Sequence, residues 1–297
     1  MRELDLIRWI RQRSRFDPGA VPVGPGDDCA VVRCGREDLL VTTDQVLDGV
    51  HFLLKRDGPA AAGRKAMARN LSDIAAMAGE PLAAVACVAL PKGLPAAACR
   101  AIYTGMRRLA DRFGCPVVGG DVGAWDGPLA IGVTVFGRPG PRGVVLRSGA
   151  KAGDAICVTG ALGGAWQSGR DKRFTPRIAE ARALAARCDL HAMIDLSDGL
   201  TTDLAHVAEE SGVGAELVAA DIPVHRGARG LEAALSDGED YELLFTLPEA
   251  QVARIRRLRL GVKVTRIGTI VRGRGLTLIH PGARRQRIRA RGWEHAT

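Results

Sequence analysis

The sequence predicts a two-domain α/β protein with mixed sheets. Strand-like apolar runs alternate with amphipathic helical patterns along most of the 297 residues. The densest cluster of glycine and proline, GRPGPRG at residues 137–143, lies near the middle of the chain and indicates a domain boundary. Similar elements begin again after it. We therefore expect an N-terminal domain over residues 1–139 and a C-terminal domain over residues 140–297.

The elements of the first half have recognisable ends. A helix is predicted over residues 61–78, because Gly79 and then Pro81 follow its last apolar position. Pro91 closes an apolar strand predicted over residues 82–90. The remaining predictions for this half are strands over 39–43, 117–118 and 129–136 and a helix over 95–113.

The second half repeats the alternation. A strand predicted over residues 155–159 runs into the glycine-rich segment VTGALGGA at 158–165. That segment either begins a helix or holds a phosphate with its backbone N–H groups. It lacks the Gly-Lys-Ser/Thr ending of a P-loop, so the pattern does not decide between the two. The other predictions are helices over 176–187 and 200–210 and strands over 191–195 and 241–247.

Composition narrows the possible functions. Hydrophobic residues make up 46% of the chain and charged residues 25%, which is typical of a soluble globular protein. No apolar run approaches the roughly 20 residues of a membrane-spanning helix. The N-terminus is charged and has no signal-peptide core, so we expect a cytoplasmic protein without a membrane partner. The seven cysteines are scattered without a C-x-x-C motif, which favours reduced thiols over a zinc site.

The net charge of +9 is concentrated near the C-terminus. Residues 251–291 contain thirteen Lys or Arg and no acidic residue. Such a stretch indicates either nucleic-acid contact or a solvated, arginine-rich surface. No nucleic-acid motif is present and aromatic residues do not interleave the basic ones. We therefore expect no nucleic-acid partner.

Carboxylates recur where the chain is expected to leave regular structure. Asp195 ends an apolar strand, and Ser197 and Asp198 follow it before a predicted helix. Helix capping accounts for one of the last two residues but not for Asp195. Acids in comparable positions are Asp27, Asp28, Asp44, Asp121, Glu239 and Asp240. Asp73 differs, because it lies inside a predicted helix.

Taken together, these acids predict a metal site. Each has a structural explanation on its own: Gly-Asp-Asp and Gly-Gly-Asp are common turns, and Asp73 can pair with Arg69 along its helix. As a set, they are the hard oxygen ligands that Mg²⁺ prefers, and clustered carboxylates repel one another unless a cation neutralises them. We expect several divalent ions and a phosphorylated ligand, although no P-loop or protein-kinase motif is present.

Seven segments, in this order, resemble the thiamine-monophosphate kinase family. They are GPGDDCAVV, VTTDQVLDGVHF, NLSDIAAMAGEP, VVGGD, LRSGAKAGDAICVTGALG, IDLSDGLTTDLAHV and GEDYELLFTL, with a further echo in GWEH near the C-terminus. The family belongs to the aminoimidazole ribonucleotide synthetase-like superfamily. The resemblance implies an N-terminal α/β domain that pairs into a homodimer, a C-terminal α/β domain, and ATP bound between them. It also implies ATP-dependent phosphorylation of thiamine monophosphate to thiamine diphosphate.

Carried over motif by motif, the resemblance implies three sets of site residues. The residues implied for several Mg²⁺ ions are Asp28, Thr42, Thr43, Asp44, Asp73, Asp121, Asp195 and Asp198. Those implied for ATP are Tyr103, Gly120, Asp121, Arg147 and Ser197, and those for thiamine monophosphate are His51, Glu239 and Trp293. No catalytic base is implied, because a phosphate monoester with a second pKa near 6 is largely ionised at neutral pH.

Three departures from the family pattern stand out. Asp237 precedes Gly238 where the family has a second glycine, and the segment after Gly164 reaches its Pro-Arg motif sooner. The threonines that often follow Gly-Gly-Asp are missing. Two alternatives therefore stay open: another ATP-using enzyme of the superfamily, or a non-catalytic nucleotide-binding homologue. The hydrogenase-maturation member is disfavoured, because it needs a C-terminal cysteine and the last cysteine here is Cys188.

Overall fold

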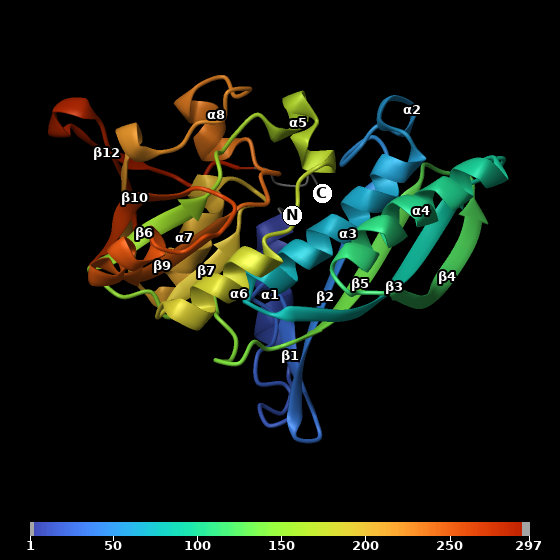
Figure 1. Ribbon diagram of the computed structural model, residues 1–297, viewed down its shortest axis with the longest axis horizontal. Coiled ribbons are helices and arrows are strands. Elements are labelled where there is room, and N and C mark those ends of the chain that lie inside the picture. Colours follow the sequence, from blue (N-terminus) through green and yellow to red (C-terminus); the bar gives the residue numbers. More distant parts are fainter. Residues whose placement is uncertain (1–2, 293–297) are drawn as a thin grey trace.

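The computed structural model describes residues 3–292, which form two mixed sheets with helices packed against them (Figure 1). The first sheet has the strand order β1-β2-β5-β3-β4, and only its β3–β4 pair is parallel. Its strands are β1 (Ala30–Cys34), β2 (Glu37–Leu47), β3 (Glu80–Pro91), β4 (Val117–Trp125) and β5 (Ala130–Arg138). The predicted two-domain, mixed α/β class is confirmed.

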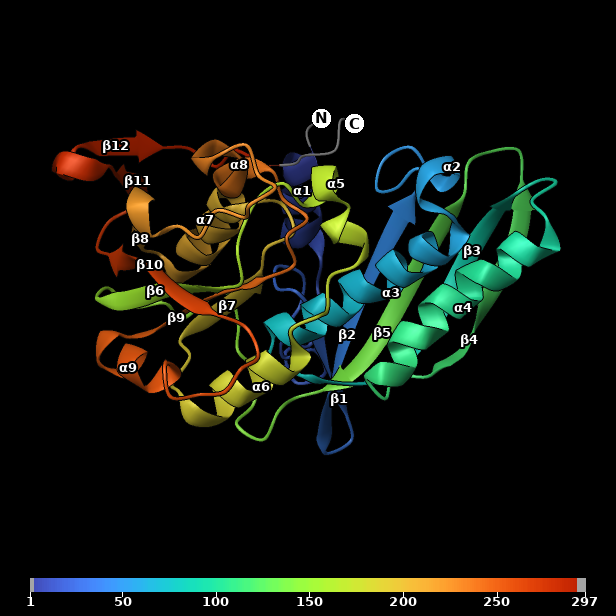
Figure 2. The ribbon, with the colours of Figure 1, turned by 45° about the horizontal axis from the view of Figure 1, so that its top comes forward.

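Helices α3 (Pro59–Ala76) and α4 (Ala96–Arg112) lie side by side on one face of this sheet (Figure 2). Met67, Leu71 and Ile74 are fully buried and recur at helical spacing, so they form the face of α3 that packs on the strands. Alternate residues of β5 are buried, as expected of a strand with one face against helices. Helix α3 also contacts α6 (Ile178–Arg187) and β7 (Ala192–Asp195) of the second half, and these contacts join the two halves.

Two glycines permit the close contact between α3 and α4. A Cβ atom at Gly63 would lie 2.0 Å from the Ile102 carbonyl oxygen, and one at Gly105 would lie 1.9 Å from the Ala60 carbonyl oxygen. Any side chain at either position would force the two helices apart. This contact fixes the inclination of α3, whose other side faces the candidate site.

The second sheet has the order β12-β11-β8-β10-β6-β9-β7. Its strands are β6 (Asp154–Thr159), β7 (Ala192–Asp195), β8 (Gly214–Val218), β9 (Leu243–Pro248), β10 (Val264–Val271), β11 (Gly275–Ile279) and β12 (Arg285–Ile288). All six residues of β6 are buried, and their side chains alternate between two cores. Cys157 belongs to the core shared with α3, whereas Ile156 and Val158 belong to the core beneath α7.

The remaining helices are between 4 and 12 residues long. They are α1 (Glu3–Arg13), α2 (Leu54–Asp57), α5 (Ala165–Ser168), α6 (Ile178–Arg187), α7 (Leu200–Ser211), α8 (Leu231–Ser236) and α9 (Val252–Ile255). Four 3-10 turns complete the fold, of which η1 (Arg170–Lys172) follows α5. The strands over residues 264–288 were not predicted from the sequence, because basic residues interrupt the apolar alternation of β10 and β12 and β11 is only five residues long.

Two strands are longer than predicted, which changes the setting of two acids. Strand β2 continues to Leu47, so Asp44 lies inside a strand rather than at its end. Strand β4 continues through Gly119, Gly120 and Asp121, so Gly-Gly-Asp is not a turn here. Gly120 has φ +149°, and a Cβ there would lie 1.8 Å from a carbonyl oxygen of β3, so the close strand pairing requires glycine.

The first sheet ends at Arg138 and the second begins at Asp154. The predicted division between residues 139 and 140 falls between these sheets, and the exact domain bounds stay a prediction. Within residues 3–292, no helix is both long and apolar enough to cross a membrane.

Candidate active site

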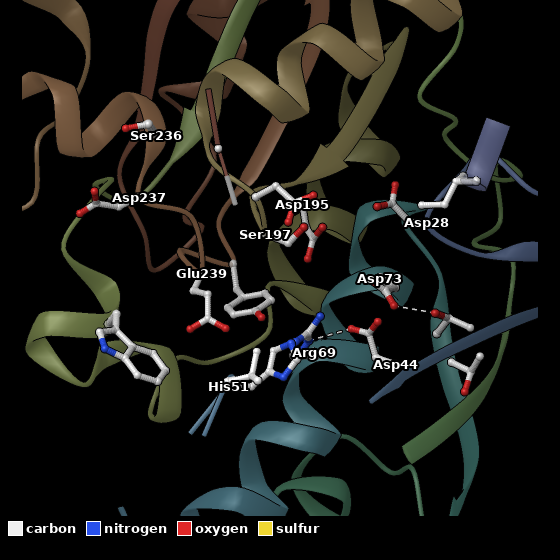
Figure 3. Close-up of a pocket in the computed structure, with 18 of the residues that line it drawn as sticks. Asp28, Asp44, His51, Arg69, Asp73, Asp195, Ser197, Ser236, Asp237 and Glu239 are labelled. Carbon is white, nitrogen blue, oxygen red and sulfur yellow. Dashed lines mark hydrogen bonds and ion pairs between the residues drawn. The ribbon is translucent and has the colours of Figure 1, made fainter. Parts of the chain in front are cut away.

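A cavity of about 790 Å³ lies where the two halves of the chain meet, and it gathers most of the predicted site residues (Figure 3). Helix α3, strand β2 and the loops after β7 and before β9 supply its walls. The predicted residues that line it are Asp28, Thr42, Thr43, Asp44, His51, Asp73, Arg147, Asp195, Ser197, Asp198 and Glu239. These residues come from both halves of the sequence.

Three aspartates converge on one side of this cavity. One carboxylate oxygen from each of Asp28, Asp73 and Asp195 lies within 4.8 Å of the other two. Asp28 precedes β1, Asp73 lies on α3, and Asp195 ends β7. Hydroxyl groups orient two of them: Thr42 donates to Asp73 Oδ2 at 2.5 Å, and Ser72 donates to Asp195 Oδ2 at 2.6 Å.

Burial and repulsion from neighbouring acids raise the pKa values of Asp73, Asp195 and the adjacent Asp27 above their usual range. Burial, and after it the nearby Asp28 charge, raise the pKa of Asp195 to about 7, against the Ser72 hydrogen bond, which lowers it. Burial raises the pKa of Asp73 well above its usual range, with Asp44 and Asp195 adding to the effect. Asp27, beside Asp28, has a pKa raised to about 6, first by burial and then by the Asp28 charge. A cation would relieve this repulsion.

The three oxygens suit Mg²⁺. Oxygen ligands on opposite sides of an octahedral Mg²⁺ lie about 4.2 Å apart, so a cluster within 4.8 Å needs little rearrangement to hold one. Asp44 and Asp198 line the same cavity and extend the acidic surface beyond these three residues. The donor set is entirely carboxylate and hydroxyl oxygen, which matches the preference of Mg²⁺ rather than that of zinc.

Two arginines balance part of the negative charge. Arg147 donates to Asp28 through Nη2 at 2.7 Å and through Nε at 3.2 Å. Arg69 donates from Nε to Asp44 Oδ2 at 2.8 Å, so it pairs across to β2 rather than with Asp73 on its own helix. Against the effect of burial, Asp28 holds the pKa of the Arg147 guanidinium above its ordinary value, and Tyr241 and Asp44 do the same for Arg69. Both arginines therefore stay charged beside the site.

The side of the cavity that carries His51 and Glu239 is organised by Lys65. The side chain of Lys65 is fully buried, and its Nζ donates to Glu239 Oε2 at 2.7 Å, to Asp171 Oδ2 at 2.8 Å and to the His51 carbonyl oxygen at 2.6 Å. The His51 ring accepts the Leu47 N–H at Nδ1, 3.1 Å away, which leaves the proton of a neutral ring on Nε2. Two predicted substrate contacts are thus tied to one lysine.

The glycine-rich segment 158–165 does not present its N–H groups to a phosphate. Gly163 N donates to both Asp240 oxygens at 3.0 and 2.8 Å, and Gly164 N donates to Asp237 Oδ2 at 3.0 Å. Carboxylates of the GEDYELLF region already occupy the positions that an anion would take. The phosphate-loop interpretation of this segment is therefore wrong.

Tyr103, Gly120 and Asp121 lie apart from the acidic cavity. They line a second cavity of about 420 Å³ between α4 and the β3–β4 edge of the first sheet. Trp293 falls outside the described residues, although Gly292 lines the acidic cavity. The contacts predicted for these four residues stay predictions.

Several residues of the acidic cavity were not predicted from the sequence. Arg69, Trp166, Gln167, Ser236 and Tyr241 line it, and Lys65 lies behind it. Glu239 and Tyr241 have φ of +55° and +49°, a left-handed conformation that is unusual for such residues. Gly238, which lies between two acids, indicated a tight turn there, but nothing in the local sequence identified Lys65 as the partner of Glu239.

A thermal-shift titration can test whether the cluster holds a divalent cation. Metal-free, the folded state keeps a proton on Asp195 up to about pH 7, whereas an unfolded aspartate loses it near pH 3.9. The unfolding free energy should therefore fall as the pH rises between these values. Bound Mg²⁺ must displace such protons. We expect Mg²⁺ to raise the melting temperature more at pH 8 than at pH 6, with NaCl of equal ionic strength as control; equal shifts at both pH values would contradict a carboxylate site.

Comparison with known proteins identifies the class of protein to which this chain belongs. The AIR synthase related protein N-terminal domain matches residues 26–138, and the AIR synthase related protein C-terminal domain matches residues 151–281. These matches define a two-domain AIR synthase-related protein. A solved HypE–HypF complex is similar in fold, with a TM-score of 0.79 at 15% identity over 97% of this chain and 99% of that chain.

Relatives of higher sequence identity show to which family within this class the chain belongs. The thiamine-monophosphate kinase of Rhodopirellula baltica is 37% identical over 310 residues, covering 99% of this chain and 97% of the relative. A structure of AaThiL complexed with AMPPCP and TMP has a TM-score of 0.84 at 30% identity, covering 99% of this chain and 97% of that one. The chain belongs to the thiamine-monophosphate kinase family.

Proposed function

We propose that this chain transfers the γ-phosphoryl group of ATP to the phosphate of thiamine monophosphate, forming thiamine diphosphate and ADP. The observation that carries the proposal is the convergence of Asp28, Asp73 and Asp195 in a cavity between the two halves. Two polyanionic substrates repel each other, and a site that gathers cations is what their reaction requires. Family membership supports the choice of substrates.

The chemistry needs charge compensation rather than a proton acceptor. An oxygen of the thiamine monophosphate attacks the γ-phosphorus of ATP, and the bond from that phosphorus to the ADP oxygen breaks. The attacking phosphate is already largely ionised at neutral pH. Several Mg²⁺ ions, when bound, supply positive charge for the phosphates. Arg147 and Arg69 add fixed positive charge at the acidic cluster.

We assign the residues of the cavity to three roles on this basis. The proposed Mg²⁺ ligands are Asp28, Thr42, Thr43, Asp44, Asp73, Asp195 and Asp198. The nucleotide is proposed to contact Arg147 and Ser197, and thiamine monophosphate is proposed to contact His51, Glu239 and Trp293. Of these residues, Asp28, Asp73 and Asp195 have the geometric support described above.

Tyr103, Gly120 and Asp121 fit this scheme if the protein is a homodimer. Val118 and Val122 of β4 keep 64% and 68% of their surface exposed, and Tyr103 keeps 49%. An exposed apolar strand at a sheet edge is a surface suited to a second copy. We propose that pairing through this face brings Asp121 of one copy toward the acidic cluster of the other, in a cytoplasmic dimer. A monomeric protein with full activity would contradict it.

An activity assay tests the function directly. Purified protein with ATP, Mg²⁺ and thiamine monophosphate is expected to produce equimolar thiamine diphosphate and ADP. Reactions with unphosphorylated thiamine, or with EDTA, are the controls and should yield neither product. If Mg²⁺ and ATP raise the melting temperature and yet no thiamine diphosphate forms, the protein is a nucleotide-binding homologue rather than this kinase.

A further inference from the structure

The shortened segment after Gly164 places a tryptophan in the acidic cavity. Residues 165–168 form α5, a single turn, and η1 follows at once over residues 170–172. Trp166 on this turn lines the cavity. The start of this turn is fixed to the end of α8, because Gly164 N donates to Asp237 Oδ2 at 3.0 Å.

Side chains from both halves hold the Trp166 ring. Lys172 Nζ lies 4.5 Å from the ring centroid, the Arg56 guanidinium carbon 5.0 Å, and Lys65 Nζ 5.3 Å. Cations at these distances are attracted to the face of an indole. The cations are themselves fixed by carboxylates, since Lys65 and Lys172 both donate to Asp171. The ring is therefore held in place before any ligand binds.

Trp166 lies on the side of the cavity that carries Glu239 and His51. Lys65 Nζ, next to the ring, also donates to Glu239 and to the His51 carbonyl oxygen. Figure 3 shows Glu239 and His51 on one side of the cavity and the Asp28, Asp73 and Asp195 carboxylates on the other. Trp166 thus belongs to the side away from the three clustered acids, where phosphates are not expected.

Trp166 is the better placed of two aromatic residues to bind a planar ring there. Tyr241 also lines the cavity, but it is only 2% exposed and its ring stacks on Phe174 with centroids 4.2 Å apart. Trp166 already faces three cations, so a neutral ring suits it better than a cationic one.

We propose that Trp166 stacks on the aminopyrimidine ring of thiamine monophosphate and determines specificity for that part of the substrate. This inference rests on the proposed function, because it names the acceptor of that reaction. Aromatic stacking on a planar heterocycle gives affinity without hydrogen bonds, while the acids on the far side bind metal and phosphate.

Steady-state kinetics and calorimetry test the role of Trp166. In Trp166→Ala we expect the KM and Kd for thiamine monophosphate to rise about tenfold, as loss of one stacking contact typically causes. Trp166→Phe keeps an aromatic face and should stay within about threefold of the wild type. The KM for ATP should be unchanged in both. Trp9→Ala is the matched control, because Arg13 covers that ring at 4.3 Å outside the cavity.

Binding of a substrate fragment shows whether Trp166 stacks on the aminopyrimidine ring or only supports the fold. The phosphorylated thiazole half of the substrate, which lacks the pyrimidine, should bind wild type and Trp166→Ala equally. Equal weakening of the fragment and the whole substrate would overturn the proposal, as would a rise in the ATP KM alone. If Trp166→Ala does not fold, an unchanged Kd in Trp166→Leu would also overturn it. Absence of thiamine diphosphate formation by the wild type would instead refute the proposed function.

Discussion

Asp195→Asn is expected to lower turnover about 10²–10³-fold, while the metal-free variant unfolds at the same or a higher temperature than the wild type. The catalytic loss follows from removing a charge that holds Mg²⁺. The stability gain follows because the Asp195 carboxylate, with a pKa raised to about 7, is destabilised at pH 8 by burial and by its neighbours. Asparagine removes that charge and can still accept the Ser72 hydrogen bond.

Thermal unfolding with and without Mg²⁺, alongside the kinase assay, measures both effects. The Mg²⁺-induced rise in melting temperature should shrink in Asp195→Asn. Asp189→Asn is the matched control, because the Asp189 side chain is 55% exposed in an ion pair with Arg142. Near-normal turnover in Asp195→Asn would refute the metal assignment. Severe destabilisation would indicate that the carboxylate serves the fold rather than a cation.

The sequence predicted the main elements because their signals are local. Apolar runs closed by glycine or proline gave α3, α4 and β3 to within a few residues. It misjudged β2 and β4, where threonines and glycines next to acids resemble turn sequences. In the folded protein, ladder pairing with β5 and β3 overrides these local preferences. Asp44 and Asp121 are therefore strand residues.

The acidic cluster could be predicted only in part. Asp28, Asp73 and Asp195 each stand out locally, and repulsion among unneutralised acids gave a reason to group them. The acid with which Arg69 pairs could not be predicted in this way, since Arg69 has acids within reach both along its helix and across on β2. The structure shows that it selects Asp44. The direction in which the arginine side chain points, and not its spacing from the acids in the sequence, decides which acid it pairs with.

Lys65→Met is expected to lower the free energy of unfolding by about 3 kcal/mol, because it breaks a fully buried ion pair and leaves Glu239 without its partner. Nothing in the local sequence indicates this role, since Lys65 lies 106 residues from Asp171 and 174 from Glu239. Asp171 keeps Lys172, whose Nζ donates to it at 2.8 Å, which limits the loss. Denaturant unfolding with an unchanged m-value would measure the effect.

Lys92→Met is the control that shows how much of the Lys65→Met effect comes from the burial of the ion pair. Lys92 pairs with Asp126 at 2.6 Å, a distance similar to that of the Lys65 pairs, but these side chains are 63% and 79% exposed. Water screens such a pair, so its loss should cost less than about 1 kcal/mol. Equal destabilisation by the two substitutions would mean that burial does not strengthen the contribution of the Lys65 ion pairs to stability. A larger loss at Lys65, together with a raised KM for thiamine monophosphate, would show that one lysine serves both the junction of the two halves and the substrate side of the cavity.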